Sequence, residues 1–147
     1  MNAKEFLSQS FTLYALIKAK KSHIQNLREM QEGISGGKQT NTKVQTSLKT
    51  DVLSEFTSMI VDMEEETRQS INKLLSIQKE ISEIIESISN VNVKLVLYER
   101  YVNLKIWEHI AEDNSYTVRW VYILHSRGLK SVDEILAFKN LEKDGTS

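Results

Sequence analysis

Residues 101–129 read YVNLKIWEHIAEDNSYTVRWVYILHSRGL, and this stretch decides the fold of the C-terminal part of the chain. Apolar residues recur at helical spacing on both sides of a short polar run, which predicts two short helices joined by a tight turn. The first helix begins over residues 106–111, the turn covers residues 112–115, and the second helix runs to about Leu129. The hydroxyl of Thr117 can cap the second helix by accepting a hydrogen bond from an amide of its first turn.

The residue types around the turn are those that a helix-turn-helix unit needs. Ala111 is small where the second helix would cross the first, and Ile110 and Tyr116 are apolar on either side of the turn. Val121 and Leu124, three residues apart, form the inward pair of the second helix. In such a unit the second helix lies in the major groove of DNA, so this stretch predicts a DNA-binding unit.

The outward side of the second helix supplies the candidate DNA contacts. Arg can make a bidentate contact with guanine, apolar side chains can meet thymine methyl groups, and Lys suits phosphates. The predicted DNA-binding residues are Lys105, Thr117, Val118, Arg119, Tyr122, Ile123, Ser126, Arg127 and Lys130. The alternative interpretation is a protein-binding module, because an exposed Ile and Tyr also suit a protein partner.

The run at residues 97–129 resembles region four of sigma-70-type factors and, more closely, phage transcriptional regulators of the ArpU/RinA type. The resemblance covers nearly the whole chain, because those regulators also begin with a long helical segment, a Gly-rich break and an acidic second helix. The residue pairs that carry it are Arg100-Tyr101, Trp107-Glu108, Ile110-Ala111, Tyr116-Thr117, Val121-Tyr122 and Leu124-His125.

The turn departs from that family pattern, which usually has Leu-Gly where this chain has Asn114-Ser115. A turn residue at positive φ is favourable for Gly, and after Gly for Asn or Asp. Either Asn114 adopts this conformation or the turn is shaped differently.

The resemblance implies a sequence-specific DNA-binding transcriptional regulator of late or packaging genes in a phage or prophage. It also implies contact with host RNA polymerase, as sigma region four makes. The second hypothesis is a non-enzymatic adaptor that keeps the helix-turn-helix fold, such as a packaging accessory or an inhibitor of a host factor.

Composition limits the class of protein. The 147 residues include no Cys, which excludes disulfides and thiolate metal sites, and no Pro, which favours long helices. No apolar run approaches the ~20 residues of a membrane span, and the N-terminus is not a secretion signal, so we expect a cytoplasmic protein of the bacterial host cell with no membrane partner. No phosphate loop, nucleophile elbow or pair of catalytic carboxylates is present, so we expect no enzyme, no catalytic residues, no cofactor and no metal site.

The net charge of −1 hides an uneven distribution of basic and acidic residues along the chain. Residues 1–50 hold eight Lys or Arg against three Asp or Glu, whereas residues 51–88 hold three against nine. Residues 89–130 hold six against four. Complementary charges favour pairing of the first long segment with the second.

The first 90 residues predict a helical hairpin arm. Residues 3–32 carry a heptad-like apolar stripe, and residues 33–49, GISGGKQTNTKVQTSLK, predict a flexible linker. A second helix follows over residues 50–88, capped by Thr50 or Asp51. Its apolar seam is the strongest periodic signal in the chain and comprises Phe56, Ile60, Met63, Thr67, Ser70, Leu74, Ile77, Ile81, Ile84 and Ile88.

A second apolar edge on the helix at 50–88 contains Ile71, Leu75 and Ile85. Either the first helix and the DNA-binding unit cover this surplus, or it is the interface of a homodimer formed through residues 51–88.

The remainder predicts a small helical domain over residues 91–141. A third helix at 93–103 completes a three-helix core, Ser131 caps a short last helix, and residues 142–147 form a frayed tail. The predicted fold is all-α: a long antiparallel two-helix, coiled-coil-like arm followed by a small trihelical helix-turn-helix domain.

Overall fold

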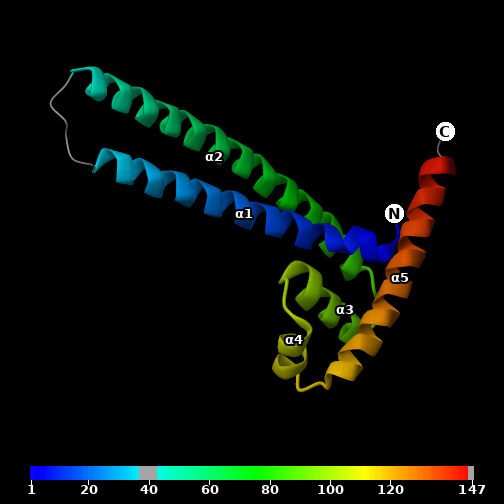
Figure 1. The fold of residues 1–147 in the computed structure, drawn as a ribbon. Helices are drawn as coiled ribbons and strands as arrows, with labels where there is room; N and C mark the ends of the chain where they lie inside the picture. Colours follow the sequence, from blue (N-terminus) through cyan, green and yellow to red (C-terminus); the bar gives the residue numbers. More distant parts are fainter. Residues whose placement is uncertain (37–42, 146–147) are drawn as a thin grey trace. The chain divides into compact units, whose positions relative to one another are not determined.

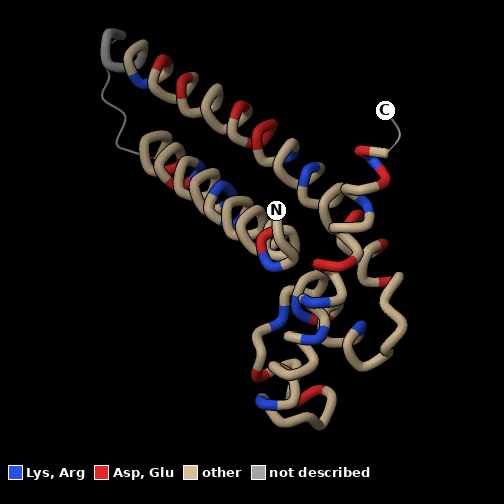
Figure 2. Tube along the Cα trace, turned by 90° about the vertical axis from the view of Figure 1, so that its right-hand side faces the viewer, with Lys and Arg blue, Asp and Glu red and all other residues tan. Residues whose placement is uncertain are grey.

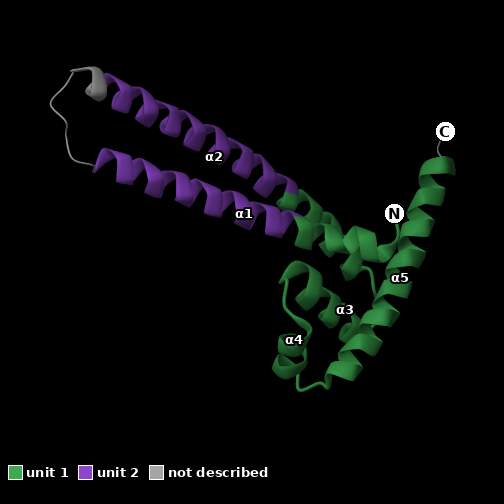
Figure 3. Ribbon diagram, viewed as in Figure 1, with its two compact units in different colours: residues 1–12, 74–147 green, residues 13–73 purple. Residues whose placement is uncertain are grey.

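The computed structural model describes residues 1–36 and 43–145, with side chains described for residues 1–36 and 47–145. The elements are α1 (Ala3–Ser35), α2 (Lys43–Glu86), α3 (Val91–Leu97), the π-helical turn η1 (Tyr98–Val102), α4 (Trp107–Asp113) and α5 (Val118–Gly145) (Figure 1). No strand occurs within the described ranges, so the chain is all-α as predicted. It divides into two compact units, residues 13–73 and residues 1–12 with 74–147, which we call the hairpin unit and the head unit (Figure 3).

The hairpin unit is an antiparallel helix pair, which confirms the predicted arm. Lys20 Nζ donates to Ser70 Oγ at 3.0 Å, and Gln31 Nε2 donates to Thr57 Oγ1 at 2.8 Å. A residue later in α1 is therefore bonded to a residue earlier in α2, so the two helices run in opposite directions. Ile17, Leu27, Ile60 and Thr67 are buried in this unit, at positions of the predicted stripes.

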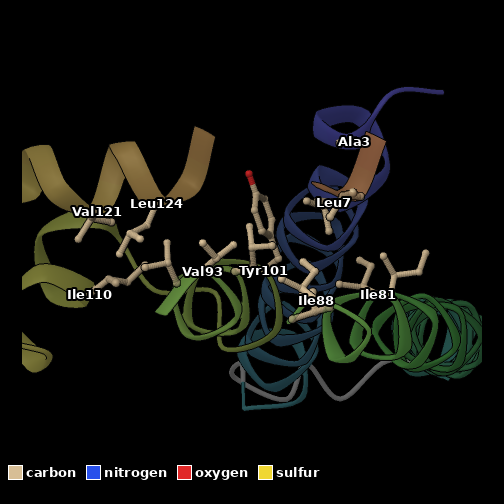
Figure 4. Close-up of a cluster of buried hydrophobic side chains, with 14 of the residues drawn as sticks. Ala3, Leu7, Ile81, Ile88, Val93, Tyr101, Ile110, Val121 and Leu124 are labelled. Carbon is tan, nitrogen blue, oxygen red and sulfur yellow. The ribbon is translucent and has the colours of Figure 1, made fainter. Parts of the chain in front are cut away.

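The head unit contains the main hydrophobic core (Figure 4). The start of α1 and the end of α2 both enter this core, so the compact units differ from the expected division at residue 90. The physical reason is that three isoleucines at the end of α2, and Ile88 just after it, are buried in the same core as Val93 of α3 and Val132 of α5. The buried residues of the core are Ala3, Phe6, Leu7, Ile81, Ile84, Ile85, Ile88, Val93, Val96, Leu97, Tyr101, Ile110, Ala111, Val121, Leu124 and Val132.

The predicted linker at 33–49 is too long. Helix α1 continues to Ser35 and α2 begins at Lys43, so a helix start at Thr50 or Asp51 is wrong. Residues 43–49, KVQTSLK, contain neither Gly nor Pro, so no helix breaker opposes extension of the helix. The part of the predicted linker at 37–42 lies outside the described residues.

The predicted helix at 93–103 is also corrected. Asn90 caps α3 through its side-chain oxygen, which accepts hydrogen bonds from the amides of Asn92 and Val93 at 3.0 and 3.1 Å. The helix therefore begins earlier than predicted. It then widens into η1, where the amide of Asn103 donates to the Tyr98 carbonyl five residues before it, at 3.0 Å.

Helix α5 is continuous to Gly145, so the predicted separate last helix is wrong. The predicted frayed tail at 142–147 is also wrong for residues 142–145, which are helical. Residues 146 and 147 lie outside the described residues. Ser131 Oγ donates to the Arg127 carbonyl at 3.1 Å and caps nothing. Gly128 does not end the helix because it is buried against α3, where an added Cβ would lie 2.9 Å from the Leu97 side chain.

Replacing Gly128 with Ala should destabilise the protein. Overpacking a buried contact costs about 1–3 kcal/mol, which exceeds the gain of about 1 kcal/mol in helix propensity. We expect urea unfolding to give a free energy lower by about 1 kcal/mol. The matched control is Gly33→Ala in α1, where nothing lies within 4 Å and stability should hold or rise. Equal effects of the two substitutions would contradict the close packing of Gly128 on Leu97.

Candidate nucleic-acid interface

Helices α4 and α5 form the two helices of the predicted unit, and the inner residues lie as expected. Ile110, Ala111, Val121 and Leu124 are buried in the head-unit core. The amide of Trp120 donates to Thr117 Oγ1 at 3.1 Å, which confirms the predicted cap of α5. One side of α5 is thereby held against α3 and α4.

The turn between α4 and α5 is closed by Ser115, not by Asn114. Ser115 has φ 56°, whereas Asn114 has φ −109°. The amides of Tyr116 and Ser115 donate to the carbonyls of Ala111 and Glu112 at 2.8 and 3.3 Å, the hydrogen-bond pattern of a Schellman motif. The turn therefore keeps a regular helix ending with Ser in the left-handed position that Gly usually occupies.

The predicted contact side of α5 is open. Thr117, Arg119, Tyr122, Ser126, Arg127 and Lys130 are exposed, and Val118 and Ile123 are half-buried. Residues 118–130 contain three Lys or Arg and no Asp or Glu. This part of α5 therefore presents positive charge without an acidic residue of its own.

Two side chains on this side are held by Trp residues. The Arg127 guanidinium lies 5.4 Å from the centre of the Trp120 ring, and the Tyr122 and Trp107 rings lie 5.2 Å apart. Both Trp residues are half-buried at the edge of the core. Such contacts limit the rotamers of Arg127 and Tyr122 before any ligand is bound.

Among the predicted contacts, Lys105 already has acidic partners within the head unit. Its ammonium group forms ion pairs with Glu99 and, at 2.9 Å, with Asp113. The hydrogen bonds to Glu99 and then to Asp113 raise the pKa of Lys105. The charge of Lys105 is compensated within the head unit, so it contributes less than Arg119, Arg127 or Lys130 to attraction of phosphates.

Arg100 is a residue whose role the sequence did not indicate. Its guanidinium lies between two aromatic rings, 4.4 Å from the centre of Phe11 and 4.3 Å from that of Trp107. It donates to the carbonyl of Lys105 at 2.9 Å, and burial lowers the pKa of Arg100. Phe11 lies far from the other two in the sequence, so no local spacing could have predicted this contact.

His125 is a structural hydrogen-bonding residue. Its Nε2 and the Tyr101 hydroxyl lie 2.6 Å apart, and its ring packs on Trp107 with centres 4.5 Å apart. Burial, helped by the charges of Arg100 and Lys4, lowers the pKa of His125 to about 4. Burial also raises the pKa of Tyr101 to about 12. Both groups are therefore neutral near pH 7.

Comparison with known proteins found no matching family model, no similar curated protein and no similar solved structure. Across residues 1–36 and 43–145, no helix combines the length and apolar character that a membrane crossing requires. In the same part of the chain, no group of three or more His, Asp or Glu side chains is arranged to hold a metal ion.

Replacing Ser115 with Gly should stabilise the head unit. A non-Gly residue in the left-handed region costs about 1–2 kcal/mol, and Gly removes this cost while adding some freedom to the unfolded chain. We expect the free energy of unfolding in urea to rise by about 0.5–1 kcal/mol. The control is Ser22→Gly in the exposed middle of α1, which should lower it by a similar amount. Destabilisation by Ser115→Gly would contradict the assigned turn.

Acidification should destabilise the protein through His125. The folded-state pKa of about 4 lies below the ordinary value of 6.5, so protons bind more readily to the unfolded chain. The stabilising contribution of neutral His125 is complete above about pH 6.5 and is lost as the pH falls towards 4. The melting temperature of the wild type should therefore fall more between pH 7 and pH 5 than that of His125→Gln. An equal fall in both proteins would show that His125 titrates normally.

Proposed function

We propose that this chain is a sequence-specific DNA-binding transcriptional regulator that reads duplex DNA with the exposed side of α5. The observation that carries the proposal is the capped α4–turn–α5 unit, whose open side presents Arg119, Arg127 and Lys130 without a carboxylate over residues 118–130. A phage or prophage origin, with late or packaging genes as targets, follows from the resemblance to ArpU/RinA-type regulators.

The proposed contacts divide by chemistry. The N-terminal residues of a recognition helix meet base edges, so Arg119 and Tyr122 are proposed to contact bases. The start of α5 near Thr117 suits a phosphate, because helix N-termini carry free amides and partial positive charge. Arg127, held over Trp120, is proposed to contact a guanine, and Lys130 a phosphate.

Two protein partners belong to this proposal. Contact with host RNA polymerase follows from the resemblance to sigma region four. A homodimer through the 51–88 helix would give a two-fold DNA site. Of the surplus apolar edge on this helix, Ile85 is buried in the head-unit core, whereas Leu75 is 59% exposed and Ile71 is half-buried. The dimer contact would therefore involve Leu75 and Ile71.

A specific observation supports the second candidate function, a non-enzymatic adaptor that binds proteins. Beyond the core, α5 carries Phe138 and Leu141, which are 63% and 70% exposed. Phe138 lines a groove together with Ile88, Val93 and Ile135. An open groove that has apolar side chains within a largely polar lining suits a protein partner, such as a packaging protein or a host factor.

Alanine replacement of Arg119 or Arg127 tests the DNA proposal. Loss of a base contact costs about 1–3 kcal/mol, so each variant should bind cognate duplex about 5- to 150-fold more weakly. Affinity would be measured by fluorescence anisotropy on a duplex selected from a randomised library. The matched control is Lys139→Ala, an exposed cation later in α5. Unchanged affinity for both Arg variants would defeat the proposed contacts.

A further inference from the structure

Arg100 differs from the other half-buried cations of the head unit. Over the described residues of this unit these cations are Lys94, Arg100 and Lys105, and Figure 2 shows basic residues in blue and acidic residues in red along the chain. Lys94 pairs with Glu86 at 3.3 Å, and Lys105 pairs with two carboxylates. Arg100 forms no ion pair among the described residues.

The environment of Arg100 is unfavourable for a cation in a second respect. Its Nε is buried without a hydrogen-bond partner in the part of the chain that the structure describes. A charged group that lacks such partners lowers stability relative to an apolar side chain of similar size. A buried polar atom without a partner calls for an explanation, so we looked for a role of Arg100 besides stability.

The groups that Arg100 does contact are aromatic. Its guanidinium lies between Phe11 and Trp107, 4.4 and 4.3 Å from the ring centres, and donates to the Lys105 carbonyl at 2.9 Å. A planar cation is attracted to the face of each ring and so holds both rings in place. Arg100 therefore fixes Trp107, the first residue of α4, against Phe11 of α1.

Trp107 in turn contacts Tyr122 on the open side of α5. The two ring centres lie 5.2 Å apart with the planes at 58°, and Tyr122 is 45% exposed. The Trp107 ring also packs on half-buried His125, with the ring centres 4.5 Å apart. The contacts of Arg100 therefore continue through one ring to a side chain on the proposed DNA-contacting side.

We propose that Arg100 is a positioning residue for DNA reading, which fixes Trp107 and thereby holds Tyr122 in the orientation that contacts a base. The inference rests on the proposed function, in which Tyr122 contacts a base. A side chain that must become ordered on binding weakens binding about 2- to 12-fold. Tyr122 avoids this loss because it is ordered before DNA arrives.

A direct contact of Arg100 with a phosphate is the other role that a basic residue could have here. The structure favours positioning, because the guanidinium lies between two rings and its Nε is buried. Loss of a phosphate contact would weaken binding to every duplex and reduce the salt slope by about one. Loss of positioning acts only through Tyr122 and leaves the salt slope unchanged.

A double-mutant cycle on the full chain separates these roles. Affinity for a cognate duplex, selected from a randomised library, would be measured by fluorescence anisotropy at several salt concentrations. Arg100→Met should weaken cognate binding about 2- to 12-fold, because Tyr122 must then become ordered on binding. In a Tyr122→Ala background, the same substitution should change the affinity less than about twofold.

Arg127→Ala supplies the matched background, because Arg127 contacts Trp120 and not Trp107. In that background Arg100→Met should keep its full effect. Phe11→Leu removes the other ring beside Arg100, so it should weaken cognate binding in the same direction and only when Tyr122 is present. Circular dichroism would verify that each variant is folded under the conditions of the titration.

No weakening by Arg100→Met, or equal weakening with and without Tyr122, would overturn the proposal. A salt slope lowered by about one in Arg100→Met would assign Arg100 to a phosphate instead. Failure of the proposed function gives a different result: the wild type then selects no motif, and the inference falls with it. Wild-type affinity of Tyr122→Ala for the cognate duplex would remove Tyr122 as a base contact and overturn the inference alone.

Discussion

The head unit depends on the close packing of α5 against α3 at Gly128. Leu97 fills the space that any side chain at residue 128 would need, so α5 approaches α3 more closely there than another residue would allow. This crossing orients α5 with Val121, Leu124 and Val132 towards the core. The opposite side, with the proposed DNA contacts, is open as a direct consequence of that packing.

Aromatic contacts of Arg100 and His125 also help to fix the orientation of α5 in the head unit. Arg100 joins Phe11 of α1 to Trp107 of α4, and His125 joins α5 to Tyr101 of η1. The π-helical turn adds one residue to the hydrogen-bonded ring, which shifts where the following side chains point. Because Tyr101 is buried within η1, that turn is part of the core and not a loose connection.

The local sequence pattern was sufficient to predict features whose residues are close together both in the sequence and in space. The buried positions of the α4–turn–α5 unit, the Thr117 cap and the hairpin seam all follow from helical spacing, and the structure agrees with them. The continuation of α5 through Gly128 could not be predicted, because helix propensity disfavours Gly and only the packing on Leu97 makes its absent side chain useful. The left-handed conformation of Ser115 likewise opposes local preference.

The candidate site was predictable only in part for the same reason. Spacing along α5 placed Arg119, Ser126 and Lys130 on the open side without any knowledge of the fold. The compensation of Lys105 depends on carboxylates from η1 and α4, and the support of Arg127 depends on how Trp120 packs. These are tertiary contacts, and a single sequence without the fold does not indicate them.

The central claim is that the open side of α5 distinguishes one DNA sequence from another. Its most direct test is selection of tight binders from a randomised duplex library, with the winners and random duplex titrated at about 50 and 200 mM salt. A defined motif is expected, bound at least about a thousandfold more tightly than random duplex at the higher salt. Weak binding without a motif, lost as salt rises, would contradict it.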